Sequence, residues 1–152
     1  MACENGHIEI AKWLIELGVN PIFGLVNINV EDDYAFRKIC EYGNLEFAKW
    51  LYYLSLQPQY HMIDIHAQRE EAFRESCKFG FLEIAKWLWD LGGVNVKAGM
   101  NYAFCWAFHN GHDTIMEQLV SWCSDYRVSK CYSEHKGKMV IYSIGYSGES
   151  TG

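Results

Sequence analysis

Apolar residues recur along this chain at helical spacing, and the clearest case lies near its start. The helix predicted over residues 7–17 carries two apolar stripes: Ile8, Ala11 and Leu14, and Ile10, Trp13 and Leu17. A helix that is apolar on more than one face is buried on more than one face. The pattern therefore predicts a helix that packs against neighbours on two sides.

The same segment returns along the chain. It starts at Gly6, comes back almost intact at Gly43 and Gly80, and has a weaker copy at Gly111, so the period is 37, 37 and then 31 residues. A fixed period of about 20–50 residues is typical of a stacked solenoid. A shorter helical pattern precedes the last three glycines, over residues 34–42, 71–79 and 102–110. Each repeat is therefore predicted to contain two helices, joined at a glycine that accepts left-handed backbone.

These motifs resemble ankyrin repeats, whose second helix has the pattern Gly-His-Leu-Glu-Ile-Val-Lys-Leu-Leu before a glycine and an Asn-containing turn. Residues 6–20 and 80–95 are close variants of that pattern, and the resemblance covers residues 2–123. The Ala-Lys-Trp-Leu motif is similar to the ankyrin arrays of large DNA viruses of amoebae. The resemblance implies an all-α ankyrin-repeat solenoid of paired antiparallel helices with finger loops, with three full repeats and a partial N-terminal one.

Departures from the family pattern concern the start of the first helix. The family's Thr-Pro-Leu-His opening is replaced by Tyr34-Ala35-Phe36-Arg37 and by its counterparts at residues 71–74 and 102–105. The hydrogen bonds that the family's Thr and His make in this turn are therefore not expected. The repeats are predicted to be less stable than consensus ones.

Domain organisation follows from where the repeat signal stops. We expect an ankyrin array over residues 1–124 and a poorly ordered tail over residues 125–152, with an edge strand at Met139–Ile144 as the less favoured alternative. Residues 1–5 correspond only to the end of a first helix. A truncated, non-functional fragment of a longer array is therefore the alternative to a working protein.

Composition changes the picture mainly through charge. The chain of 152 residues is 50% hydrophobic and has a formal net charge of −6, without the clustered basic face of nucleic-acid-binding proteins. No apolar run reaches the ~18 residues of a membrane span, and no signal peptide precedes the array. We therefore expect an intracellular protein in the cytoplasm, or in the host cytoplasm if the chain is viral, with no nucleic acid, membrane or small-molecule partner.

Candidate chemistry is sparse. Cys3, Cys40 and Cys77 are spaced by 37 residues, which one buried position per repeat explains without a disulfide. Two groups with metal-ligand residue types lack the paired short spacings of a zinc module: Cys105, His109 and His112, and Cys123, Cys131 and His135. No phosphate loop, nucleophile elbow or kinase motif occurs. The chain is therefore interpreted as a non-enzyme without metal or cofactor.

Aromatic residues divide into two predicted groups. Trp13, Trp50 and Trp87 occupy one position of the second helix, so packing inside the stack explains them better than ligand stacking. Four further aromatic residues fall outside that ladder and are predicted to be exposed: Tyr52, Tyr53, Trp89 and Trp106.

The resemblance also implies a binding site. In ankyrin proteins the partner lies against the finger tips and the ends of the first helices, beside the concave groove. Carried onto this sequence, the finger positions are Glu31, Asp33, Gln68, Glu70 and Asn101, and the helix-end positions are Glu4, Asn5, Glu41, Tyr42, Lys78, Phe79, His109 and Asn110. Aromatic side chains would anchor the partner there, and the acids would steer a basic one. The predicted function is thus protein–protein interaction.

Overall fold

A computed structural model describes residues 8–18, 27–133 and 138–144 of the chain. In these ranges it has seven helices and two strands, which are α1 (Ile8–Gly18), α2 (Val30–Glu41), α3 (Leu45–Ser55), α4 (Ala67–Lys78), α5 (Leu82–Leu91), α6 (Ala98–His109), α7 (Asp113–Trp122), β1 (Tyr126–Ser133) and β2 (Lys138–Ile144). The predicted solenoid is confirmed, with three helix pairs preceded by one helix.

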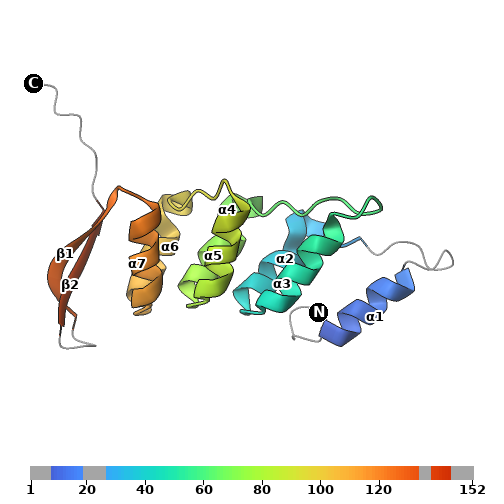
Figure 1. Cartoon of the computed structure of the whole chain (residues 1–152), viewed down its shortest axis with the longest axis horizontal. Coiled ribbons are helices and arrows are strands. Elements are labelled where there is room, and N and C mark those ends of the chain that lie inside the picture. The colour runs from blue at the N-terminus through green and yellow to red at the C-terminus, as the bar shows by residue number, and fades with distance from the viewer. Residues whose placement is uncertain (1–7, 19–26, 134–137, 145–152) are drawn as a thin grey trace, which may run out of the picture.

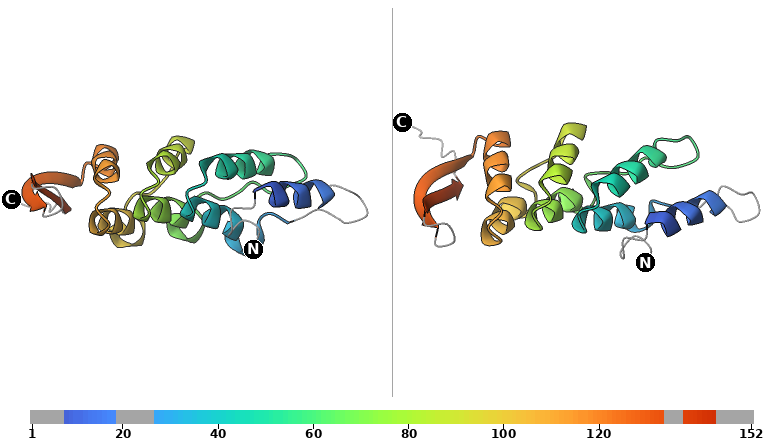
Figure 2. Two further views of the ribbon diagram at one scale, coloured as in Figure 1. Left: turned by 90° about the horizontal axis from the view of Figure 1, so that it is seen from below. Right: turned by 60° about the horizontal axis from the view of Figure 1, so that its bottom comes forward.

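The helix pairs stack along the long axis of the molecule, from α1 at one end to the β-hairpin at the other (Figure 1). The first helices α2, α4 and α6 form one layer and the second helices α3, α5 and α7 form the other (Figure 2). Contacts run from α2 to α4 and from α4 to α6 in the first layer, and from each first helix to its own second helix. The fold is thus a two-layer stack in which each repeat contacts its neighbours, as expected for a solenoid.

The core is a continuous strip between the two layers. Phe36 and Phe73 from the first helices are fully buried, and so are the second-helix residues Phe47, Ile84 and Leu88, at 0–1% exposure. Cys40 and Cys77 are fully buried at equivalent positions, where burial raises the pKa of their thiols. Their prediction as small core residues is confirmed.

The glycines between the helices serve two purposes. Gly43, Gly80 and Gly111 have φ of +82°, +88° and +72°, a left-handed backbone that residues with a Cβ rarely adopt. In addition, a Cβ on Gly43 would lie 2.4 Å from Cε1 of Phe81 in the next repeat. A Cβ on Gly80 would lie 2.8 Å from Cε1 of His112. The first two of these glycines therefore also make room for a ring of the following repeat.

Each first helix starts with a turn that the sequence analysis did not foresee. Residues 31–33, 68–70 and 99–101 are all left-handed, with φ between 52° and 64°, before the regular helix begins. Such backbone costs a non-glycine residue roughly 1–2 kcal/mol, so specific contacts must hold it. Arg37 supplies two of them, because its Nη2 and Nε donate to the carbonyls of Glu31 and Asp32, at 2.8 and 2.9 Å.

The tryptophan ladder is only partly a core feature. Trp50 and Trp87 are half-buried and pack against the core, Trp50 at 5.6 Å from the Phe47 ring and Trp87 at 5.7 Å from the Tyr52 ring. Trp13, by contrast, is 58% exposed, so the packing prediction is wrong for the first copy.

Helix α1 exposes residues whose counterparts are buried. Ile10 and Leu14 are 50% and 43% exposed, whereas the equivalent Ile84 and Leu88 are 1% and 0% exposed. Within the described residues no first helix pairs with α1 as α2 pairs with α3. The same residue types therefore have different surroundings at the end of the stack and inside it.

The start of the tail packs on the last repeat. Tyr126 is 2% exposed, its ring stacks on Phe104 at 4.3 Å, and its hydroxyl donates to Oδ1 of Asn101 at 2.8 Å. From Tyr126 onwards β1 pairs with β2 in an antiparallel hairpin, in which Ser129 lies opposite Ile141. The strand at residues 139–144 was the less favoured alternative in the sequence analysis. That the tail is poorly ordered in solution stays a prediction.

Replacing leucine by alanine at equivalent positions of α1 and α5 should separate the two environments. Leu88→Ala should lower the free energy of unfolding by about 2–5 kcal/mol, because it leaves a cavity in the core. Leu14→Ala should cost less than about 1 kcal/mol, because the side chain is largely exposed already. Urea denaturation followed by circular dichroism measures both. Equal losses in the two variants would contradict the stacking described above.

Two truncations should locate the end of the folded array. Removal of residues 127–152 should leave the helical signal and the melting temperature nearly unchanged, because repeats are stabilised by their neighbours. Removal of residues 125–152, which also removes the buried Tyr126 ring, should cost about 3 kcal/mol or more. Thermal melts of both chains test this. If both melt alike, Tyr126 does not cap the last repeat.

Candidate functional site

The predicted binding residues do not all lie at the surface. Six are exposed, namely Glu31, Tyr42, Gln68, Phe79, His109 and Asn110, and three are half-buried, namely Glu41, Lys78 and Asn101. Asp33 and Glu70 are 5% and 6% exposed. Glu4 and Asn5 lie outside the described residues. The helix-end residues in the described part of the chain are thus at least partly exposed, whereas two of the finger acids are buried.

Asp33 and Glu70 are buried because each holds the loop of the following repeat. Oδ2 of Asp33 accepts the backbone N–H of Asp64 at 2.9 Å, and Oε1 of Glu70 accepts that of Asn95 at 3.1 Å. The left-handed turn before each first helix directs these side chains toward the neighbour instead of toward solvent. Their prediction as exposed binding residues is therefore wrong. We call these two bonds and their counterpart at Asn101 the inter-repeat clasp.

Further contacts complete the clasp. Nδ2 of Asn29 donates to the other carboxylate oxygen of Asp33 at 2.6 Å, and Nδ1 of His66 lies 3.0 Å from both oxygens of Glu70. In the last repeat Asn101 occupies the same position and accepts the hydroxyl of Tyr126. A residue four positions earlier thus partners each buried carboxylate, as burial of a charge requires.

We call the outward side of the first helices the first-helix face. It consists of Tyr34, Lys38, Glu41 and Tyr42 from α2, Glu71, Arg74, Glu75, Lys78 and Phe79 from α4, and Tyr102, Trp106, His109 and Asn110 from α6. The spacing of three or four residues places each set on one side of its helix. This face contains all the predicted helix-end residues within the described part of the chain.

The acids of the first-helix face are paired with bases of the same face. Lys38 binds Glu41, Lys78 binds Glu75 at 2.8 Å, and Arg37, which lies 8% exposed beneath the face, binds Glu71. The hydrogen bonds to Glu41 and Glu75 raise the pKa of Lys38 and Lys78 respectively. Because these carboxylates are already neutralised, they contribute little to the attraction of a basic partner.

Aromatic rings surround Lys78. Its ammonium lies 4.8 Å from the ring centroid of Phe79, 5.3 Å from that of Trp106 and 5.8 Å from that of Tyr102. Phe79 is 43% exposed and Trp106 is 38% exposed, and Tyr42 at the end of the preceding first helix is 53% exposed. Phe79 and Trp106 thus combine a cation–π contact with partial exposure to solvent.

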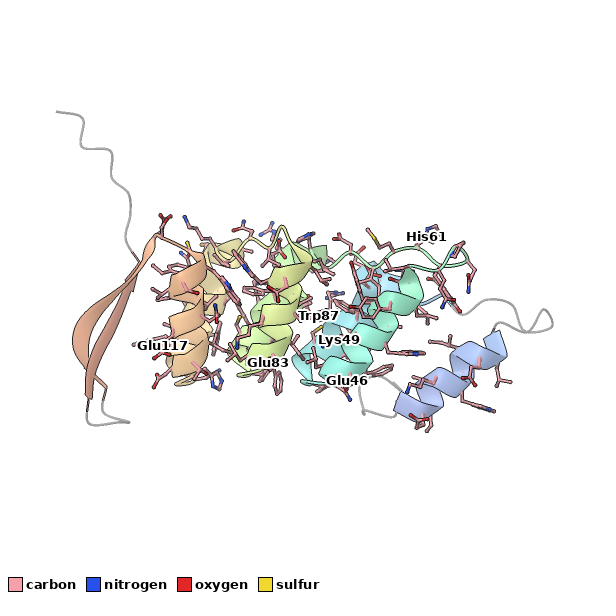
Figure 3. All side chains as sticks on the ribbon, viewed as in Figure 1. Glu46, Lys49, His61, Glu83, Trp87 and Glu117 are labelled. Carbon is pink, nitrogen blue, oxygen red and sulfur yellow. The ribbon has the colours of Figure 1, made fainter. Side chains whose placement is uncertain are left out.

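The second helices α3, α5 and α7 are net acidic. Within the described structure, α3, α5 and α7 carry five carboxylates, Glu46, Glu83, Asp90, Asp113 and Glu117, against the lysines Lys49 and Lys86. Figure 3 shows Glu46, Glu83 and Glu117 on these second helices, with Trp87 between α3 and α5. The first helices beyond their left-handed turns carry four bases, Arg37, Lys38, Arg74 and Lys78, against Glu41, Glu71 and Glu75. The expectation of an acidic binding face therefore does not hold for the helices.

Three residues of the first-helix face were not among the predicted site residues. Lys38, Arg74 and Tyr102 lie at the outward positions of their helices, and each contacts a charged or aromatic neighbour. Their helical spacing from the predicted helix-end residues could have identified them. Of the four aromatic residues predicted to be exposed, Tyr53 and Trp106 are, whereas Tyr52 and Trp89 are half-buried, and Trp89 stacks on Trp122 at 4.8 Å.

The candidates Cys105, His109 and His112 have other neighbours in the structure, and His135 of the second group lies outside the described residues. Cys105 is exposed, the His109 ring contacts Trp106 at 5.4 Å, and Nε2 of His112 lies 3.0 Å from the carbonyl of Lys78. Across residues 8–18, 27–133 and 138–144, no three His, Cys, Asp or Glu side chains form a metal-binding group. Nor is any helix of this part long and apolar enough to cross a membrane.

If the inter-repeat clasp stabilises the array, substitutions of Glu70 should lower its stability. Glu70→Ala should lower the free energy of unfolding by about 1–3 kcal/mol, because the N–H of Asn95 loses its acceptor. Glu70→Gln should cost less, since its amide oxygen can still accept that bond. The control Glu31→Ala, at an exposed position of the same turn, should change stability by about 0.5 kcal/mol or less. Urea denaturation of the three variants measures this, and equal stability of Glu70→Ala and Glu31→Ala would contradict the clasp.

The comparisons with known proteins concern the first part of the chain. Residues 1–33 match the family model of the ankyrin repeat. Neither curated proteins nor solved structures gave a match. The matched segment contains the first copy of the motif, and the three helix pairs that follow repeat that motif in register. Family match and fold together support an ankyrin repeat protein.

Proposed function

We propose that this chain is a non-catalytic module that binds a protein partner through its first-helix face. Ankyrin repeats are generally protein-interaction modules and typically not enzymes. The observation that carries the proposal for this chain is the row of exposed rings at the ends of neighbouring first helices. Tyr42 ends α2, Phe79 ends α4, and Trp106 lies one turn before the end of α6.

Large side chains exposed on three neighbouring first helices suggest an interaction surface, since exposed apolar surface often marks one. Their positions do not serve the core, since the buried residues of the same helices lie on the other side, at Phe36, Phe73 and Phe104. Aromatic side chains dominate the energetics of protein interfaces, where they bury a large area with few rotatable bonds.

The finger loops extend this surface. Glu31 and Gln68 are exposed there, and Nε2 of Gln68 donates to Oδ2 of Asp32 at 2.7 Å, which links neighbouring turns. Met100 in the corresponding turn of the last repeat is 92% exposed. A partner that covers the first-helix face would therefore also reach these loop residues. The cytoplasmic location and viral origin that the sequence resemblance suggests belong to the same proposal.

Removing two of the rings should weaken binding without unfolding the array. Tyr42→Ala combined with Phe79→Ala should cost about 2 kcal/mol or more of binding free energy, as truncation of aromatic hot spots does. The melting temperature should change little, because both side chains are about half-exposed and lie outside the core. A partner isolated with the parent chain is titrated against parent and variant by calorimetry.

A matched control comes from the other layer. Tyr53→Ala combined with Leu56→Ala removes two side chains that are 55% and 50% exposed near the end of α3. This variant should bind as the parent does. If the control loses affinity and the first-helix variant does not, the site lies on the second-helix side and the proposal is wrong.

A further inference from the structure

The three first helices differ at one repeated position. Arg37, Arg74 and Cys105 occupy it in successive repeats, and the position that faces it in the next repeat is Glu71 for Arg37 and Tyr102 for Arg74. Arg37 therefore has a carboxylate from the next repeat. Arg74 instead faces the aromatic ring of Tyr102.

Arg74 makes only part of the contacts that Arg37 makes. The guanidinium of Arg37 binds Glu71 through Nη1 and donates to two backbone carbonyls through Nε and Nη2. Nη2 of Arg74 keeps the equivalent bond to the carbonyl of Gln68 at 3.2 Å, but its buried Nε has no hydrogen-bond partner. Among the residues that the structure describes, Arg74 has no carboxylate partner either.

From this comparison we infer that Arg74 receives an acidic side chain of the partner, which plays the part toward Arg74 that Glu71 plays toward Arg37. The inference rests on the proposed function and names the chemistry of its ligand. The ring of Tyr102, 4.7 Å from the guanidinium carbon, holds the group in position and leaves it half-buried instead of enclosed like Arg37. A guanidinium binds a carboxylate through two parallel N–H donors, and such pairs are stronger than neutral hydrogen bonds.

The surroundings favour an acidic partner residue. The neighbouring carboxylates Glu71 and Glu75 are occupied by Arg37 and Lys78, so Arg74 is the base of this face without an acid. The exposed Phe79 and Trp106 lie on the same face and would contact apolar residues beside that acid. The ligand is thus a peptide segment with an Asp or Glu next to apolar or aromatic residues. This is the opposite charge from the basic partner expected from the sequence.

Selection of peptides tests this inference with a defined probe. A displayed library of random 12-residue peptides is selected on the full chain, and enriched peptides should share an Asp or Glu beside an apolar residue. The best peptide and its Asn or Gln counterpart are then titrated against the parent, Arg74→Gln and Lys86→Gln. Lys86→Gln is the matched control, because it removes the same charge from the second-helix side, where Lys86 pairs with Glu83.

On the parent and on Lys86→Gln, replacing the peptide carboxylate by an amide should weaken binding roughly tenfold or more. On Arg74→Gln that replacement should change affinity little, because the carboxylate has lost its partner. A carboxylate effect that persists on Arg74→Gln, or enriched peptides without an acid, overturns the inference. If the enriched peptides contain no acid but bind more weakly to Phe79→Ala than to the parent, the inference about Arg74 is wrong and the proposed function is still supported. Peptides indifferent to both Phe79→Ala and Tyr42→Ala, or no enriched peptide at all, refute both.

Supplying the missing carboxylate within the chain gives a second test. Tyr102→Glu places an acid where Glu71 stands relative to Arg37, so it should occupy Arg74 and weaken the acidic peptide roughly tenfold relative to Tyr102→Gln. Both variants lose the same ring, which makes Tyr102→Gln the control for packing. If the two variants bind the acidic peptide equally, Arg74 is not its receptor.

Discussion

A buried carboxylate that accepts a backbone N–H of the next repeat is the interaction on which this stack depends. In a solenoid the helices of one repeat cannot bury their apolar faces alone, so the geometry between neighbours decides whether the core is continuous. The bonds from Asp64 to Asp33 and from Asn95 to Glu70 set that geometry at the edge of the stack where the loops leave it. They also hold the three left-handed residues at the start of α2 and of α4 in place, a conformation that is unfavourable without such partners.

Repetition made most of the fold predictable. The 37-residue period located the helix pairs, and the glycine at each junction indicated a left-handed residue there, which the positive φ of Gly43, Gly80 and Gly111 confirms. Periodicity alone did not distinguish an end repeat from an inner one. Trp13 and Trp50 occupy the same place in the motif, yet only the latter has neighbours on both sides, so burial depends on the next repeat and not on the residue.

The site was harder to predict than the fold because charge was taken as a sign of exposure. Asp33 and Glu70 are carboxylates in a loop-like segment, and such residues are mostly exposed. Here the left-handed turn directs them toward the loop of the next repeat, and no local sequence pattern predicts that turn. One signal was present, because Asp33, Glu70 and Asn101 share a register and can all accept a hydrogen bond. The helix-end residues that the structure describes do lie at the ends of the first helices, because helical spacing is enough to find such positions.

The pairing of charges across the first-helix face changes how this surface would recognise a partner. Where Lys78 is held by Glu75 and by three rings, its charge is internal to the protein and the rings are what a partner meets. Specificity would then come from the shape of the aromatic row and from the position of the few charges that lack a partner. Long-range electrostatic steering by this face would be weak, because paired opposite charges a few ångströms apart nearly cancel at larger distances and salt screens what remains.

The clasp also bears on how the chain folds. Its bonds join residues 31 and 25 positions apart, and the Arg37–Glu71 pair spans 34, so the long-range contacts described here close loops of about one repeat. Closing a loop of that length has a modest entropic cost that does not grow with the number of repeats. Chains whose contacts join residues no more than about one repeat apart fold quickly for their size. Folding can therefore begin in whichever repeat pair first forms its clasp and extend from there one repeat at a time.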